Sequence, residues 1–258
     1  MLKRVGTQVA ALAILGLMCG SAQAETLAPG TPLGGDYELG PSSPGKWGSP
    51  TLGTGATITY SFMATGVSTG EDGAGGTIIA LADFMPVGFL EEIEAAFAAW
   101  SAVADLTFVE VADAGEAYNA SGASGDIRLG GHDFDGPSGT LAHGYYPPNN
   151  GNTAAGDIHF DVDETWVIGF DGPGFDIFAV AAHEIGHAIG LAHSDVVGAL
   201  MYPFYSEAFV GPQADDIAGA RFLYGTGDAV VPEPSTFALL GIGLIGLIGY
   251  RRKTQQAA

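Results

Sequence analysis

The chain has 258 residues and a formal net charge of −21 at pH 7. Outside its two ends, residues 1–24 and 231–258, three basic residues face 28 acidic ones, which gives 3 − 28 = −25. Such a surface repels nucleic acid, so we expect no nucleic-acid partner. It suits cation binding, although a solvating or salt-adapted acidic surface explains much of the charge equally well.

Residues 1–24 are typical of a secretory signal peptide. Two basic residues precede an apolar run, and the small residues Ala-Gln-Ala end at Ala24. The only cysteine, Cys19, lies in this segment, and Met18 before it is larger than the small residue usual before a lipoprotein cysteine. The exported part would then have no disulfide, although export usually permits them. Bound metals are the obvious other source of stability.

Residues 25–45 are rich in Gly, Pro and Ser and predict a mobile leader. One α+β domain without internal repeats is expected over residues 46–226. Alternating apolar residues or short apolar runs predict strands, and apolar stripes at helical spacing predict helices. The strands are expected at 56–63, 106–111, 126–130 and 157–162, and the helices at 89–104, 178–190 and 213–225.

The sequence HEIGHAIGLAH, residues 183–193, carries three of the six histidines. On a helix, His183 and His187 lie one turn apart on the same face, a spacing that suits two imidazole ligands of one tetrahedral zinc. Glu184 is one step round the helix, where it can stand beside the metal as a general base without binding it.

His193 needs a turn in the chain. An unbroken helix would carry it about 15 Å beyond His183, too far for one metal. Gly190 lies between, and glycine ends helices by adopting left-handed dihedrals. An amphipathic core helix with incidental histidines is the alternative, but the glycine and the third histidine favour a metal site. Met201, in GALMYP, supplies the methionine turn that accompanies this pattern.

The C-terminal residues 227–258 predict a linker and a sorting tail. A Pro-Glu-Pro triplet at 232–234 precedes an apolar run at 237–250 and then three basic residues. Fourteen residues are short for a full membrane span, which needs about 20. The arrangement resembles a PEP-CTERM sorting signal. Such a signal implies that a bacterial protein is exported and held transiently in the membrane by its C-terminal helix until a membrane transpeptidase acts on it. A plain membrane anchor is the alternative.

Several further motifs occur in order along residues 46–225. They are KWGSPTLGTGATITYSF, FDGPSGTLAHGYYPP, GDIHFDVDETW, HEIGHAIGLAHS, ALMYP and DDIAGARFLYG. The chain is similar in these motifs to the matrixin branch of the metzincins, the matrix-metalloproteinase-type catalytic domains. The resemblance implies a zincin-like α+β fold: a twisted, mostly parallel sheet with an antiparallel edge strand, a long active-site helix, a Met-turn and a C-terminal helix.

The resemblance also implies a zinc-dependent endopeptidase that uses zinc-bound water and Glu184 as general base. Met201 packs beneath the metal, and Tyr202 and Pro203 help form a wall of the substrate pocket. The segment around Leu141 and Ala142 pairs with an extended substrate peptide. Protein or peptide substrates, export to the cell surface or medium, and a monomer are expected.

Additional metals are implied by the same resemblance. His143 and His159 map to ligands of a structural zinc, with His132 as a further candidate, although each histidine taken alone is more simply a hydrogen-bonded or exposed one. A calcium site maps to oxygen ligands in two segments: Asp135, Gly136, Ser138, Thr140, Asp161 and Glu164. A second calcium would map to Asp126 and Asp157.

Two features depart from the family pattern. The family carries an aspartate two positions after its first structural-zinc histidine. In this chain Phe134, two positions after His132, takes that place in a shortened loop. Asp133 or water would then complete the ligands of that zinc. Latency also differs, because no cysteine follows residue 19 to block the zinc and the leader is too short for a folded prodomain. Asp36 could cover the metal in principle, but the sequence gives little support for that; the enzyme would otherwise be made active or be controlled by sorting.

Two rival functions stay open from the sequence. One is a non-catalytic surface or matrix protein built on a retired protease domain, which the complete ligand set and Glu184 argue against. The other keeps the zinc but places the chain in a serralysin-like or astacin-like branch. Calcium-binding glycine repeats would favour the serralysin-like branch, and the sequence has none.

Overall fold

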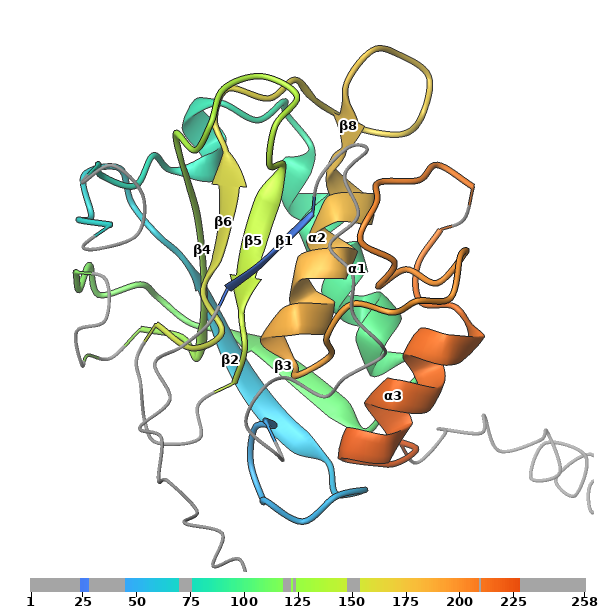
Figure 1. The fold of residues 1–258 in the computed structure, drawn as a ribbon. Helices are drawn as coiled ribbons and strands as arrows, with labels where there is room; N and C mark the ends of the chain where they lie inside the picture. The colour runs from blue at the N-terminus through green and yellow to red at the C-terminus, as the bar shows by residue number, and fades with distance from the viewer. Residues whose placement is uncertain are drawn as a thin grey trace, which may run out of the picture.

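The computed structural model in Figure 1 describes residues 24–27, 45–69, 76–117, 122, 124–147, 154–208 and 210–227. The signal sequence before Ala24, the leader residues 28–44 and the C-terminal sorting tail from residue 228 onward lie outside these residues. Within the described part, no helix has both the length and the apolar character needed to cross a bilayer.

A six-stranded sheet forms the centre of the molecule, in the spatial order β1-β5-β6-β4-β2-β3. Strands β3, β2, β4 and β6 run parallel, whereas β5 is antiparallel to β6 and β1 is antiparallel to β5. The predicted mostly parallel sheet with an antiparallel strand is therefore confirmed. The strands are β1 (Ala24–Leu27), β2 (Ala56–Phe62), β3 (Leu106–Glu110), β4 (Ile127–His132), β5 (Ala142–Tyr145) and β6 (Ile158–Asp161).

Two long helices pack on one face of this sheet, as Figure 1 shows for α1 (Phe89–Ser101) and α2 (Ile177–Ala188). The fully buried Trp100 of α1 donates its indole N–H to the carbonyl of Ala182 at 2.8 Å, which ties α1 to the middle of α2. The C-terminal helix α3 (Ala214–Tyr224) lies beyond the end of α2. All three predicted helices are confirmed within a few residues.

Some elements were not predicted. Besides β1, they are the short 3-10 helix η1 (Leu81–Asp83) and the two-residue strands β7 (Trp166–Val167) and β8 (Phe175–Asp176), which pair in parallel just before α2. Strand β5 was predicted only as an edge segment for substrate. It is the strand that brings the sheet next to α2.

Candidate active site and metal centres

Helix α2 begins at a side-chain cap and then buries almost every residue. Asp176 is the N-cap residue, and its Oδ1 accepts the N–H of Ala179 at 2.8 Å. From Ile177 to Ala188 only Phe178 is not buried. A helix enclosed in this way carries its polar side chains into the protein interior, where each of them needs a partner.

The end of α2 is a Schellman motif. Gly190 has φ +109, the N–H of Leu191 bonds to the carbonyl of Gly186 at 2.9 Å, and the N–H of Gly190 bonds to the carbonyl of His187 at 2.8 Å. The chain therefore reverses after one left-handed residue. The predicted role of Gly190 is confirmed, because His193 returns to the histidines of the helix.

His183, His187 and His193 are all buried, and each offers a ring nitrogen such that the three nitrogens lie within 4.8 Å of one another. The Nδ1 atoms of His183 and His187 lie 2.7 Å from the carbonyl oxygens of Leu200 and Leu191. A carbonyl only accepts hydrogen bonds, so both Nδ1 atoms carry the proton and both Nε2 atoms carry a lone pair.

Those two Nε2 atoms are 3.1 Å apart. Burial lowers the pKa of His183 to about 3, helped by the neighbouring His193, and it lowers the pKa of His187 well below its usual value. Both rings are therefore neutral, and two neutral lone pairs facing at this distance repel unless a cation lies between them. This donor set fits zinc, which is held by three neutral imidazoles with one open position in hydrolytic enzymes.

Glu184 is fully buried and lies between α2 and β5. A Cβ atom added to Gly144 of β5 would come within 2.7 Å of the Glu184 carbonyl oxygen and 3.2 Å of its carboxylate Oε2. The carboxylate thus stands beside the strand, and the same added Cβ atom would lie 3.2 Å from the Cβ of His187. Gly144 was not singled out from the sequence, and its lack of a side chain is what allows this approach.

The segment after His193 forms a turn beneath α2. A Cβ atom on Gly186 would meet the Met201 sulfur at 2.2 Å, so the buried methionine fills the space that the glycine leaves. The buried carboxylate of Asp216 accepts the N–H groups of Leu200 and Met201 at 2.7 and 2.9 Å. Asp216, in the first turn of α3, thus fixes this turn from a distant part of the sequence.

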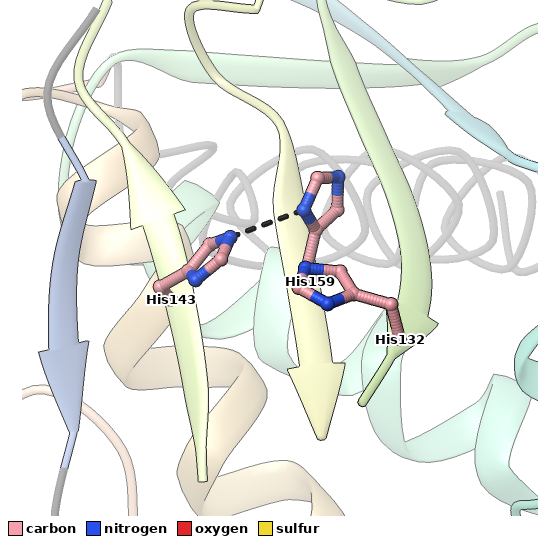
Figure 2. A group of neighbouring side chains, drawn as sticks. All are labelled: His132, His143 and His159. Carbon is pink, nitrogen blue, oxygen red and sulfur yellow. Dashed lines mark hydrogen bonds between the residues drawn. The ribbon is translucent and has the colours of Figure 1, made fainter. Parts of the chain in front are cut away.

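A second histidine group lies on the other face of the sheet. Successive side chains on a strand point to opposite faces, so His143 points away from α2 while Gly144 faces it. His132, His143 and His159 converge there from β4, β5 and β6, as Figure 2 shows, with ring nitrogens within 4.8 Å of one another and 3.1 Å between His143 Nε2 and His159 Nδ1. All six histidines thus form two buried groups of three, either of which could hold zinc.

The sequence profile described as Matrixin matches residues 82–225, more than half of the chain. The chain belongs to the matrixin family. A second profile, the PEP-CTERM protein-sorting motif, matches residues 230–253.

Several curated proteins are similar to the chain in sequence. The chain is 40% identical over 160 residues to karilysin of Tannerella forsythia, covering 57% of this chain and 32% of karilysin. It is 43% identical over 136 residues to interstitial collagenase of Equus caballus, covering 52% of this chain and 28% of that protein. It is 42% identical over 147 residues to human matrix metalloproteinase-20, covering 55% and 29%. The chain therefore spans about a third of these relatives' length.

Phe134 changes the second histidine group relative to the matrixin pattern. Its ring stacks on His143 with centroids 4.7 Å apart and planes at 4°, and it meets His132 edge-on at 4.2 Å. The Nδ1 of His132 lies 3.0 Å from the carbonyl oxygen of Asp133, so that side of the ring faces its own loop. An aromatic ring therefore covers the histidines where the family carries a carboxylate.

Two carboxylates of the predicted first calcium site, those of Asp135 and Glu164, contact the same loop. The Asp135 carboxylate accepts the N–H and O–H of Thr140 at 2.9 and 3.1 Å, and Glu164 Oε1 accepts the N–H of Ser138 at 2.6 Å. Gly136 lies in the same loop with φ +83. Both carboxylates thus bond to the backbone of the loop in which the family binds calcium.

Asp161 forms a group with Asp133 and Asp163, with carboxylate oxygens within 4.8 Å of one another. Asp161 is fully buried, and its Oδ2 accepts no hydrogen bond from the described residues. Burial raises its pKa, and the charges of Asp163 and Asp135 add to that effect. A bound cation would relieve this repulsion.

The second predicted calcium site would involve Asp126 and Asp157. Asp126 Oδ2 accepts the N–H and O–H of Thr59, both at 2.8 Å, and Asp157, just before β6, is buried. Neither aspartate belongs to a group of three metal-ligating side chains within the described residues. This site stays a prediction.

The predicted pocket residues lie on both sides of α2. Tyr202 follows the methionine and donates its N–H to the carbonyl of Ala199 at 3.2 Å, and Pro203 comes next. Leu141 and Ala142 are fully buried at the start of β5. Their contacts with substrate stay a prediction.

Proposed function

We propose that the chain is an exported zinc endopeptidase that hydrolyses peptide bonds in protein substrates. The observation that supports this most strongly is the convergence of three neutral, buried imidazoles with a buried glutamate beside them. A structural zinc site accounts for the histidines but gives no reason to bury the Glu184 carboxylate next to the strand that a substrate would join.

The metal would be held by His183, His187 and His193, and when bound it supplies a Lewis acid that acidifies water and polarises a carbonyl group. Glu184 accepts the proton from the attacking water and then donates it to the nitrogen of the leaving amine. The carbonyls of Leu200 and Leu191 keep the two helical imidazoles in one tautomer and orientation throughout.

Substrate would bind as an extended strand along β5. The short approach between Gly144 and Glu184 brings the backbone of that strand close to the general base. Pairing through main-chain groups gives affinity for many sequences, and Tyr202 and Pro203 would form the wall of the pocket that selects a side chain. The role of Leu141 and Ala142 is to start that strand.

Additional metals would stabilise the domain, which has no disulfide. A structural zinc at His132, His143 and His159 would tie β4, β5 and β6 together. Calcium would bind where Asp161 meets its acidic neighbours and the loop Asp135–Thr140. A second calcium at Asp126 and Asp157 is the remaining site suggested by the family pattern.

Localisation follows from the two ends of the chain. The PEP-CTERM motif is a sorting signal of bacterial cell-surface proteins, and we place the protease domain outside the cytoplasmic membrane. The apolar run 237–250 would hold the chain in the membrane transiently until the sorting enzyme acts on it.

The test is proteolysis of an unfolded protein such as reduced casein by the purified chain. Glu184→Gln keeps the size of the side chain but removes the base, so the rate should fall about 10²- to 10⁴-fold while bound zinc, measured by elemental analysis, stays unchanged. Glu91→Gln, on the exposed side of α1, is the matched control and should keep the wild-type rate. A zinc chelator should abolish the activity and added zinc should restore it.

The outcomes separate the proposal from its rivals. Undiminished proteolysis by Glu184→Gln would remove Glu184 as the base. Absence of proteolysis by a zinc-loaded wild-type chain, on any of several unfolded proteins, would favour a non-catalytic surface protein.

A further inference from the structure

The two histidine groups differ in what lies beside them. The buried carboxylate of Glu184 is next to the three histidines of the catalytic site. The second group, His132, His143 and His159 (Figure 2), is instead bordered by aromatic rings. All three of its histidines are more than nine-tenths buried, so a metal ion held there is withdrawn from bulk water.

Two aromatic side chains border this second group. The Phe134 ring lies parallel to the His143 ring, with 4.7 Å between the ring centroids, and it meets the His132 ring at 4.2 Å. Tyr145 meets His143 and His159 edge-on, with centroids 5.3 and 6.1 Å apart. Neither of these neighbours is a carboxylate.

The next carboxylate along the chain does not take this place. The Asp133 side chain belongs to the acidic group with Asp161 and Asp163, whereas the histidine group contains no carboxylate from the described residues. The main-chain carbonyl of Asp133 lies 3.0 Å from Nδ1 of His132. A carbonyl only accepts hydrogen bonds, so Nδ1 carries the proton and Nε2 of His132 carries the lone pair for a metal.

A zinc ion is held less firmly when no charged ligand completes its coordination. Structural zinc sites are almost always closed by four protein ligands. Three neutral imidazoles leave the full double charge of the ion in a buried place, whereas a carboxylate ligand would reduce that net charge to one. Because the cost of burying charge rises steeply with its size, the site without a carboxylate binds zinc more weakly.

We propose that Phe134, which stands where the family carries an aspartate, makes the second zinc an exchangeable ion held by three histidines. The proposal rests on the second zinc site of the proposed function. Zinc then stabilises the joined strands β4, β5 and β6 only while its free concentration exceeds the dissociation constant of this site. The stability of the domain therefore follows the zinc supply outside the cell, while the catalytic histidines on the other face of the sheet keep their own zinc.

Restoring the carboxylate tests the role of Phe134. All proteins carry Glu184→Gln, which prevents self-digestion, and His159→Ala identifies which bound zinc is the second one. In competition with a zinc chelator of known affinity, Phe134→Asp should tighten the binding of that zinc at least about tenfold, because even outer-shell partners of a metal change its affinity by that factor. Phe134→Ala, which removes the ring without supplying a carboxylate, is the matched control and should not tighten it. Asp133→Asn, measured at constant calcium, should leave the affinity unchanged.

Thermal unfolding gives a second readout. In the parent protein, Tm should keep rising with free zinc after the catalytic site is filled, and Phe134→Asp should reach its highest Tm at a lower zinc concentration. Equal zinc affinity with Phe134 and with Phe134→Asp, or a tenfold loss of affinity in Asp133→Asn, would overturn the proposal. Absence of a second zinc from the parent protein would remove the site and this proposal with it. Failure of the zinc-loaded wild-type chain to cut any protein would contradict the protease function alone, because none of these measurements depends on catalysis.

Discussion

Replacing Gly190 with alanine tests the turn that assembles the zinc ligands. The substitution imposes φ +109 on a residue with a side chain, which costs about 1–3 kcal/mol. It also places the new Cβ 2.0 Å from the Gly45 carbonyl oxygen, which must retreat to at least 3.0 Å. Gly45 cannot move freely, because Trp47, two residues on, donates its indole N–H to the carbonyl of Ala188 just before the same turn. Such overpacking costs about 1–3 kcal/mol more.

The matched control is Gly66→Ala. Gly66 has φ +101, close to that of Gly190, but a Cβ atom there meets nothing within 4 Å. The free energy of unfolding, measured by urea in the metal-free Glu184→Gln background, should fall by about 2–6 kcal/mol for Gly190→Ala and by only about 1–3 kcal/mol for Gly66→Ala. Zinc affinity should fall for Gly190→Ala alone, since His193 follows that turn. Equal destabilisation by the two variants, with unchanged zinc affinity, would refute the reasoning.

Three further predictions concern other parts of the domain. His159→Ala should lower the zinc content from about two to one per chain while Glu184-dependent proteolysis persists at low temperature; a content that stays unchanged would contradict the second zinc site. Asp216→Asn leaves one carbonyl oxygen for the backbone N–H groups of the methionine turn. The free energy of unfolding, measured by urea, should therefore fall by about 2–3 kcal/mol. The KM for zinc-dependent hydrolysis should rise. Arg128 donates to the Asp113 carboxylate at 2.9 and 3.0 Å. Burial alone would raise the pKa of Asp113, but the hydrogen bonds from Arg128 and its other donors outweigh it and hold that pKa below its usual value of 3.8. The stabilisation by the ionised Asp113 carboxylate is therefore complete above about pH 4 and is lost as the pH falls through the lowered pKa. Asp113→Asn should lower the free energy of unfolding by about 2–3 kcal/mol at pH 7, and this loss should shrink toward pH 3. A loss that does not depend on pH would contradict the role of this pair.

The catalytic ligands could be predicted from sequence because their geometry is local. His183 and His187 are related by one helical turn, and Gly190 and His193 follow within a few residues. Helical spacing and the conformational freedom of glycine are enough to bring these side chains together. The core helices were likewise predictable from apolar stripes that follow the same short-range spacing.

Contacts between distant segments could not be predicted in this way. Gly144 matters because β5 packs on α2, and nothing within its own strand indicates that a side chain there would meet Glu184. Phe134 was noted only as a departure from the family pattern, and its stacking on His143 depends on how the shortened loop folds over the sheet. The pairing of β1 with β5 joins residues more than a hundred positions apart, in a segment whose composition predicts a mobile leader.

The attachment of Trp47 sets a limit on how far the N-terminus can be trimmed. Its indole N–H donates to the carbonyl of Ala188 at 2.7 Å, and its main-chain N–H donates to the hydroxyl of Tyr224 at 3.0 Å. That hydroxyl in turn donates to the carbonyl of Ile189 at 2.8 Å. A host protease that cuts upstream of Gly45 would leave these three hydrogen bonds intact. A cut just beyond Trp47 would remove the contacts that hold the last turn of α2. Recombinant versions of the domain should therefore start no later than residue 45.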